Sequence, residues 1–187
     1  MTGIFVAVVG PSGVGKDSLI GFARERLEAS GRVSFVRRVV TRQADGGSED
    51  HDSMGVEDFA KAEAAGQFAL NWDAHGLRYG LPIALEHDLE AGRVVVANLS
   101  RGVIPALMVR YPNALVVSVI ADHDVIARRL ANRGRETPES IQRRLARSVA
   151  DGMPASTIRI DNSGDLDVAG EQFTQLLADA AGVRERA

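Results

Sequence analysis

One stretch constrains the fold of this chain more than any other, the segment Gly10-Pro11-Ser12-Gly13-Val14-Gly15-Lys16-Asp17. It follows the phosphate-binding pattern G-x-x-x-x-G-K-[ST] at every position except the last. A short apolar run at residues 4–9 precedes it and predicts a buried strand, and residues 18–27 are expected to continue as a helix. Glycines allow the backbone to wrap an anion with its N–H groups, and the helix start directs partial positive charge at the same anion. The stretch therefore predicts a phosphate-binding loop.

The predicted loop assigns roles to its residues. Lys16 supplies a mobile cation for the β- and γ-phosphates of a nucleotide such as ATP. The predicted nucleotide contacts are Gly10, Pro11, Ser12, Gly13, Val14, Gly15, Lys16, Asp17 and Ser18.

Asp17 is the departure from the pattern, because this position ordinarily offers a neutral hydroxyl to a magnesium ion. A carboxylate is also a hard oxygen ligand that suits Mg²⁺. Ser18 is a poor substitute, since one residue along a helix turns the side chain by about 100°. We expect Asp17 to be the protein's magnesium ligand; the alternative is a merely favourable acid in a first helical turn.

Composition excludes several classes of protein. The 187 residues suit a single domain spanning 1–187, and the lack of cysteine rules out disulfides and thiol nucleophiles. A net charge of −3 and an aromatic content of 5% argue against a general nucleic-acid surface. The first apolar run is too short for a signal or membrane-spanning segment. We therefore expect a cytoplasmic protein without nucleic-acid or membrane partners; a homodimer stays open.

Apolar periodicity predicts an α/β fold. Strands are expected at 4–9, 33–40, 93–97, 115–121 and 156–160, and helices at 18–27, 56–65, 82–91, 104–111, from 122 to the glycine at 134, 137–150 and 166–180. Residues 68–72 and 77–79 are expected to form a small antiparallel insertion, and 43–55 a polar substrate loop. The order predicts a three-layer, mostly parallel sheet with phosphates bound at the carboxyl ends of its strands.

An arginine-rich region late in the chain predicts a closing lid at about 128–147. Arg129 and Arg133 are four residues apart, and Arg143 and Arg147 repeat that spacing. Such a lid is typical of small kinases, which position two substrates, neutralise charge and exclude water. The alternative is an ordinary solvated arginine face paired with nearby glutamates.

Several segments resemble the guanylate kinase fold family of P-loop kinases, which includes the nucleoside monophosphate kinase type. They are the loop itself, Thr41-Arg42, Tyr79-Gly80, Arg129 to Gly134, Arg144-Leu145 and Asp161-Asn162. Four further segments most resemble the ribose 1,5-bisphosphate phosphokinases of bacterial phosphonate degradation: Gly15 to Ser18, Gly47 to His51, Trp72 to Leu77 and Asn98 to Arg101. The resemblance covers nearly the whole chain, with a substrate-binding insertion at about 42–80.

The resemblance implies site residues. Beside Lys16, which the loop motif itself assigns to charge stabilisation, the resemblance places Arg129, Arg133 and Arg144 among the charge-stabilising catalytic residues, and Asn162 at the nucleotide. Where guanylate kinases read guanine with acids, this chain has Leu70 and Leu99, which accept no hydrogen bond. The implied substrate contacts are Arg42, Arg78, Tyr79 and Arg101, with Arg42 at the acceptor 1-phosphate and Arg78 or Arg101 at the 5-phosphate. Further candidates are Ser48, Glu49, His51, Trp72 and His75, of which Trp72 and His75 are more often packing residues.

The implied reaction uses ATP and Mg²⁺ to phosphorylate ribose 1,5-bisphosphate, giving 5-phosphoribosyl 1-diphosphate and ADP. Two alternatives stay open. One is a nucleoside monophosphate kinase, which a GMP assay would reveal. The other is a catalytically silent guanylate-kinase-like module that binds a partner protein, although such a module would not need Lys16 or the lid arginines.

Overall fold

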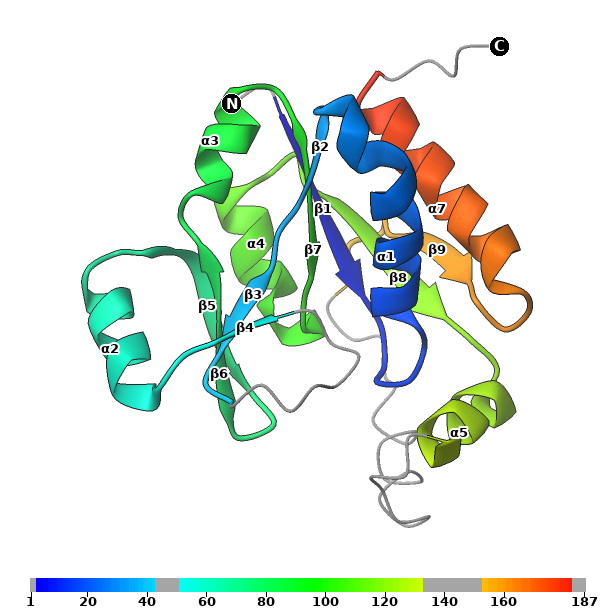
Figure 1. Ribbon diagram of the computed structural model, residues 1–187, viewed down its shortest axis with the longest axis horizontal. Helices are drawn as coiled ribbons and strands as arrows, with labels where there is room; N and C mark the ends of the chain where they lie inside the picture. Colours follow the sequence, from blue (N-terminus) through cyan, green and yellow to red (C-terminus); the bar gives the residue numbers. More distant parts are fainter. Residues whose placement is uncertain (1–2, 43–50, 133–152, 183–187) are drawn as a thin grey trace.

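A computed structural model describes residues 3–42, 51–132 and 153–182 of the chain. The fold has three layers, with helices on both faces of a central sheet and a second, smaller sheet beside it (Figure 1). None of the helices in the described ranges is long and apolar enough to cross a lipid bilayer.

The central sheet is parallel throughout. Its strands, in spatial order, are β2 (Val33–Phe35), β7 (Val94–Asn98), β1 (Ile4–Val9), β8 (Leu115–Ile120) and β9 (Ile158–Asp161). Helices α1 (Lys16–Leu27) and α7 (Leu166–Ala180) cover one face, and α3 (Leu85–Glu90) and α4 (Ile104–Arg110) cover the other (Figure 1). The expected three-layer, mostly parallel α/β fold is confirmed.

Burial on both faces explains the continuous apolar runs of the central strands. Along β1, Val6 and Val8 pack into the core beneath α1 and α7, whereas Phe5, Ala7 and Val9 pack into the core beneath α3 and α4. Successive side chains of a strand point to opposite faces, so both sets must be apolar when both faces are covered.

The second sheet carries the predicted antiparallel insertion. Its spatial order is β4 (His51–Ser53), β3 (Arg38–Val40), β6 (Leu77–Pro82) and β5 (Phe68–Ala74), with α2 (Val56–Ala64) packed against it. Strands β5 and β6 form a hairpin whose two turn residues, His75 and Gly76, have φ values of 56° and 74°. Two left-handed residues in succession define the type I′ turn that matches strand twist. The remaining described α-helix, α5 (His123–Asn132), follows β8.

Three expected elements are corrected by the structure. The run 33–40 is two strands in different sheets, because the chain leaves the central sheet after Val36, whose amide still bonds the Val96 carbonyl at 2.9 Å. Residues 51–53 of the expected polar loop form β4, with a buried His51. Pro82 ends β6 rather than opening a helix, and α3 begins at Leu85.

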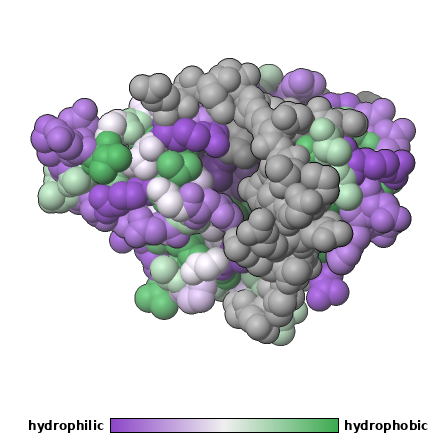
Figure 2. Space-filling model, turned by 90° about the horizontal axis from the view of Figure 1, so that it is seen from below, coloured by the Kyte–Doolittle hydropathy of each residue, from purple (hydrophilic) through white to green (hydrophobic). Residues whose placement is uncertain are grey.

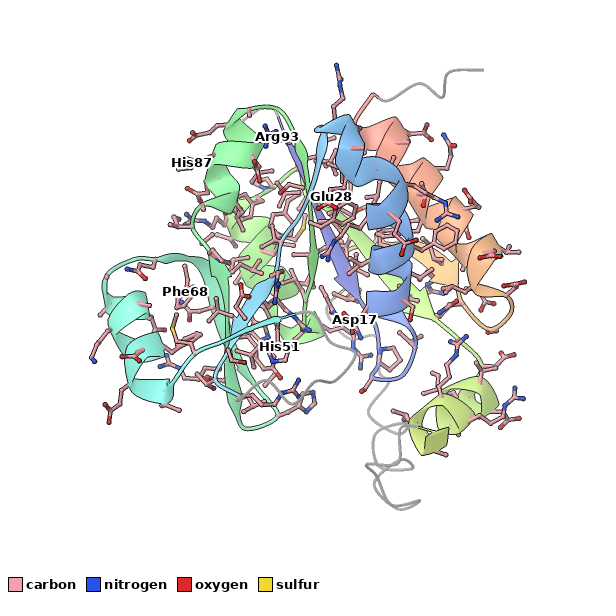
Figure 3. The ribbon with its side chains drawn as sticks, viewed as in Figure 1. Asp17, Glu28, His51, Phe68, His87 and Arg93 are labelled. Carbon is pink, nitrogen blue, oxygen red and sulfur yellow. The ribbon has the colours of Figure 1, made fainter. Side chains whose placement is uncertain are left out.

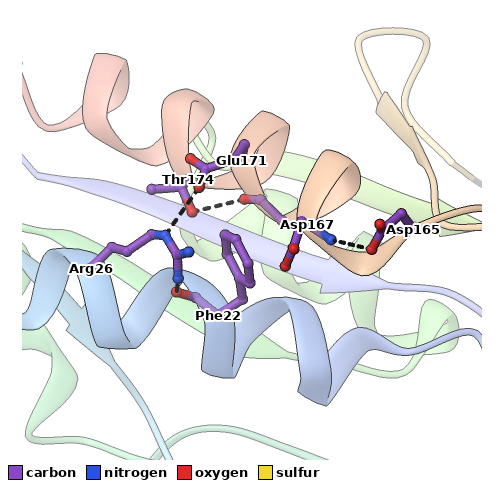
Figure 4. Close-up of polar contacts among 7 residues, drawn as sticks. Phe22, Arg26, Asp165, Asp167, Glu171 and Thr174 are labelled. Carbon is purple, nitrogen blue, oxygen red and sulfur yellow. Dashed lines mark hydrogen bonds and ion pairs between the residues drawn. The ribbon is translucent and has the colours of Figure 1, made fainter.

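Helices α1 and α7 contact each other closely at a glycine. Gly170 of α7 lies against the Phe22 ring, and the Arg26 guanidinium carbon is 3.4 Å from the centre of that ring. Arg26 also donates to Glu171 Oε1 at 3.2 Å and to the Phe22 carbonyl at 3.2 Å (Figure 4). This contact aligns the helix that leaves the phosphate loop with the last helix of the chain.

The substitution Gly170→Ala is predicted to destabilise the fold. The added Cβ would lie 2.6 Å from Cδ1 and 2.7 Å from Cγ of Phe22. We expect the free energy of unfolding, measured by urea denaturation, to fall by about 1–3 kcal/mol from overpacking. Gly21→Ala in α1 is the control, since its Cβ would meet nothing within 4 Å, and it should raise stability by about 0.5–1 kcal/mol. Equal effects of the two substitutions would contradict this packing.

Candidate active site

The phosphate loop joins β1 to α1 and is held in its shape by three glycines. Gly10, Gly13 and Gly15 have φ values of 148°, 82° and 95°, which side-chain-bearing residues rarely adopt. Any Cβ at these positions would also collide with a neighbour: the Val119 carbonyl at 2.5 Å, the Leu130 side chain at 2.8 Å and the Asn162 amide at 2.3 Å, respectively. Glycine is therefore required at all three positions, both by the backbone conformation and because no space is left for a Cβ.

Two side chains from later in the chain donate hydrogen bonds to the same backbone carbonyl of the loop. Asn162, which follows β9 and is 1% exposed, donates from Nδ2 to the Val14 carbonyl at 2.8 Å. Arg129 of α5 donates from Nη1 to the same oxygen at 3.2 Å. The structure thus brings two predicted residues, Asn162 and Arg129, to the predicted loop.

The turn after β9 sets the position of Asn162. The Asp161 carboxylate accepts hydrogen bonds from the Ser163 hydroxyl at 2.5 Å and the Ser163 amide at 2.9 Å. These two donors lower the pKa of the Asp161 carboxyl below its ordinary value. Ser163 also accepts from the Asp122 amide at 2.8 Å, which ties the turn to the start of α5.

A cavity of about 550 Å³ opens beside the loop, at the carboxyl ends of β1 and β7. Both sheets contribute to its wall. The lining residues are Gly10, Pro11, Ser12, Gly13, Gly15, Lys16, Asp17, Arg38, Arg42, Ala74, His75, Leu77, Tyr79, Asn98, Leu99, Ser100, Arg101 and Gly102. Where its residues are described, the face seen in Figure 2 is mostly hydrophilic, with hydrophobic residues in small separate patches.

The charges of this wall favour an anionic ligand. Lys16, Arg38, Arg42 and Arg101 supply four positive charges, and Asp17 is the only carboxylate among the described lining residues, so their sum is +3. The Lys16 ammonium donates to the carbonyls of Gly10 at 2.9 Å and Pro11 at 3.1 Å, which keeps it at the mouth of the loop. Clustered guanidinium groups are suited to bidentate binding of phosphate.

Aromatic residues of the hairpin connect the second sheet to the central one. Trp72 and Tyr79 face each other across β5 and β6 and stack with their ring centres 5.4 Å apart. Trp72 donates from Nε1 to the Ser100 hydroxyl, just beyond β7, at 2.9 Å. Arg38 lies over the Tyr79 ring, with its guanidinium carbon 5.7 Å from the centre of that ring. Tyr79 and Arg38 line the cavity. Trp72 positions them through its stacking on Tyr79 and its hydrogen bond to Ser100.

Arg78 is not brought to this cavity with the other predicted substrate residues. It follows the alternation of β6, so its side chain points to the opposite face from that of Tyr79. There its guanidinium bonds Glu63 of α2 at 2.5 Å and lies 4.8 Å from the Phe59 ring centre. Arg42, Tyr79 and Arg101 do line the cavity, as does Leu99, whereas Leu70 is buried in the core.

Asp17 and the cavity fit a magnesium ion bound with a nucleotide. Asp17 stands in the first turn of α1 beside the loop, at the same end of the molecule as His51 and opposite to His87 and Arg93 (Figure 3). Its Oδ1 accepts a hydrogen bond from Asn98 Nδ2 at 2.7 Å. No group of three or more acidic or histidine side chains that could hold a metal occurs within residues 3–42, 51–132 and 153–182. A single carboxylate beside a phosphate-binding loop suits Mg²⁺, which commonly takes one or two carboxylates and completes its shell with phosphates and water.

Four arginines of the predicted lid, Arg133, Arg143, Arg144 and Arg147, and the loop residues Ser48 and Glu49 lie outside the described residues. His51 is described and buried, and its carbonyl accepts a hydrogen bond from Arg37 at 3.1 Å. His75 lines the cavity from the hairpin turn.

Comparison with known proteins identifies the family of this chain. It is 50% identical over 181 residues to the ribose 1,5-bisphosphate phosphokinase PhnN of Chelativorans sp. (strain BNC1), covering 96% of this chain and 87% of that protein. It is 47% identical over 180 residues to the protein of the same name from Brucella melitensis, covering 96% and 94%. The chain belongs to the ribose 1,5-bisphosphate phosphokinase family. It is therefore a phosphotransferase, as the loop and the resemblance predicted.

The fold of this phosphokinase is shared with guanylate kinase. The guanylate kinase of Anaplasma phagocytophilum superimposes with a TM-score of 0.68 at 16% identity, covering 95% of this chain and 86% of that one. A scan against models of protein families found no match. The expected P-loop kinase fold is thus confirmed by structure as well as by sequence.

Among the lining residues that were not predicted as site residues, two are buried and polar, Arg38 and Asn98. They are 8% and 7% exposed. A signal existed for Arg38, because an arginine inside an apolar strand is costly unless it has a partner or a function. Asn98 ends a run of four apolar residues at the carboxyl end of a parallel strand, where ligands bind in such sheets.

The substitution Asn162→Asp is predicted to weaken the phosphate loop. A carboxylate cannot donate to the Val14 carbonyl and would face it with like charge. We expect the free energy of unfolding to fall by about 1–3 kcal/mol, and ADP to raise the melting temperature less than it does for the native phosphokinase. Asn113→Asp, in an exposed turn, is the control. If both variants behave alike, Asn162 does not support the loop.

Proposed function

We propose that this chain uses MgATP to phosphorylate ribose 1,5-bisphosphate at its 1-phosphate, producing 5-phosphoribosyl 1-diphosphate and ADP. The observation that carries the proposal is the cavity, which sets four cations against one carboxylate beside a phosphate loop. Relatives that are 47–50% identical to this chain are named for the same acceptor. A bisphosphorylated sugar needs cations for two phosphates and no acids for a base.

The chemistry is an in-line transfer. An oxygen of the 1-phosphate attacks the γ-phosphorus, an O–P bond forms, the bond between the γ-phosphorus and the β,γ-bridging oxygen breaks, and the electron pair leaves on ADP. The attacking oxygen is largely deprotonated near neutral pH, so no general base is needed. Catalysis then consists of positioning and charge neutralisation. When bound, Mg²⁺ supplies further neutralisation of the phosphate oxygens.

The residues divide into two groups by the sheet that carries them. The phosphate loop, Lys16, Asp17 and Asn162 serve the nucleotide from the central sheet. Arg38, Arg42 and Tyr79 line the cavity from the second sheet and Arg101 lines it from the segment after β7, and these four residues are proposed to bind the acceptor. We assign Arg42 to the 1-phosphate and Arg101 to the 5-phosphate. Arg129, Arg133 and Arg144 are proposed to stabilise the transferring phosphoryl group.

Leucine at the cavity wall favours a sugar over a purine. Leu99 is 2% exposed and lines the cavity, and its side chain accepts no hydrogen bond. A guanine there would leave N–H donors unpaired, at a cost of about 1–3 kcal/mol for each buried donor.

Incubation of the purified protein with ATP and Mg²⁺ is predicted to convert ribose 1,5-bisphosphate to 5-phosphoribosyl 1-diphosphate. The product can be detected by mass spectrometry, with ADP measured by a coupled assay. GMP in place of the bisphosphate should give at least tenfold lower kcat/KM, since a single unpaired donor of about 1.4 kcal/mol suffices for that factor. More efficient phosphorylation of GMP would show that the acceptor is wrongly assigned. Consumption of neither acceptor, with Lys16 intact, would favour a binding module.

Arg78 and Arg101, the two arginines that the sequence offered as alternatives for the 5-phosphate, are predicted to behave differently. Arg101→Ala should raise KM for ribose 1,5-bisphosphate about 10- to 100-fold, because a phosphate loses a charge-assisted hydrogen bond. Arg78→Ala should leave that KM within about threefold and instead lower the melting temperature, because Arg78 bonds Glu63 outside the cavity. Steady-state kinetics and thermal denaturation of both variants separate the roles. The opposite pattern would restore Arg78 as the phosphate contact.

A further inference from the structure

Asp17 and Asn98 form a contact between the phosphate loop and the neighbouring strand. Strands β1 and β7 pair in parallel register with Val8 opposite Asn98, so the end of β7 lies beside the loop that follows β1. Asn98 Nδ2 reaches Asp17 Oδ1 at 2.7 Å. Both residues line the cavity, and Asn98 is only 7% exposed.

The second polar atom of Asn98 is also buried. Its Oδ1 has no hydrogen-bond partner among the residues that the structure describes. An unsatisfied buried carbonyl oxygen costs about 1–3 kcal/mol, so such a group needs a reason. Asn98 lines the cavity next to the only described carboxylate of its wall, so the pair lies where a metal ion bound with a nucleotide would sit.

The residue types at these two positions are exchanged relative to the usual magnesium site of P-loop enzymes. That site combines a hydroxyl residue at the end of the loop with an aspartate at the end of a strand. Here the aspartate is on the loop and the neutral side chain is on the strand. The pair keeps one negative charge and one donated hydrogen bond in both arrangements, because Asn98 donates here as a hydroxyl would donate to a strand aspartate.

We propose that Asn98 is a positioning residue for Asp17, and that the pair is a compensated exchange of the magnesium-site carboxylate from the strand to the loop. The hydrogen bond from Nδ2 fixes one carboxylate oxygen and leaves the other to face the metal. An aspartate at both positions would place two carboxylates at hydrogen-bond distance, and a neutral residue at both would remove the charge. The inference rests on the proposed use of MgATP but not on the identity of the acceptor.

Four proteins test the exchange: the native chain, D17S, N98D and the double variant D17S/N98D. The readouts are the melting temperature without ligand and the Mg²⁺ concentration that gives half of the extra thermal stabilisation by ADP. Neither depends on phosphoryl transfer, so the test stands even if ribose 1,5-bisphosphate is not the acceptor. Asn113→Asp is the control for an added surface charge.

D17S should raise the half-effective Mg²⁺ concentration about tenfold or more, because the carboxylate is lost. N98D should lower the melting temperature in the absence of Mg²⁺, by more than Asn113→Asp does. The double variant should return the Mg²⁺ requirement to within about threefold of native, a strongly non-additive result. The proposal is overturned if the double variant needs as much Mg²⁺ as D17S. It is also overturned if N98D matches Asn113→Asp in melting temperature and native Mg²⁺ dependence.

Discussion

The conformation of the phosphate loop is the constraint on which the rest of the molecule depends. Its three left-handed glycines are enclosed by Val119 of β8, Leu130 of α5 and Asn162 after β9, all at distances that exclude a Cβ. Elements from the second half of the chain thus close around a loop at its beginning. A phosphate-binding backbone is pre-organised in this way before any ligand arrives, which reduces the ordering cost of binding.

The two sheets divide the work of a two-substrate enzyme. The parallel sheet ends at the phosphate loop, and the second sheet supplies arginines and an aromatic wall across the same cavity. The bond from Trp72 to Ser100 joins the two at the cavity rim. In-line transfer requires the reacting atoms to be aligned and about 3–3.5 Å apart, so a link between the two sheets bears on that alignment, although Trp72 is not among the residues that line the cavity.

Much of the fold could be predicted because local patterns and tertiary packing agree. The strand Ile4–Val9 and the helix Leu166–Ala180 have the predicted bounds, since one is buried on both faces and the other has one apolar face. The prediction of one strand at residues 33–40 was wrong, because an apolar run does not reveal that the chain changes sheets within it. Prediction of the site from the sequence had the same limit. The loop was evident from its spacing, whereas the contact of Asn98 with Asp17 joins residues 81 positions apart and depends on strand order.

The proposed reaction needs more positive charge than the described cavity supplies. Of the two proposed substrates, MgATP carries about two negative charges and ribose 1,5-bisphosphate about three to four near neutral pH, a total of about five to six. The described lining supplies +3, so about two to three charges are left to be neutralised at the moment of transfer. Between residues 133 and 147 the sequence has five arginines and two glutamates, a net +3. Charge is neutralised less well in a site that excludes water than in water itself, so a deficit of this size favours further cations near the transferring phosphoryl group. The arginines between residues 133 and 147 lie outside the described residues, and their role there stays a prediction.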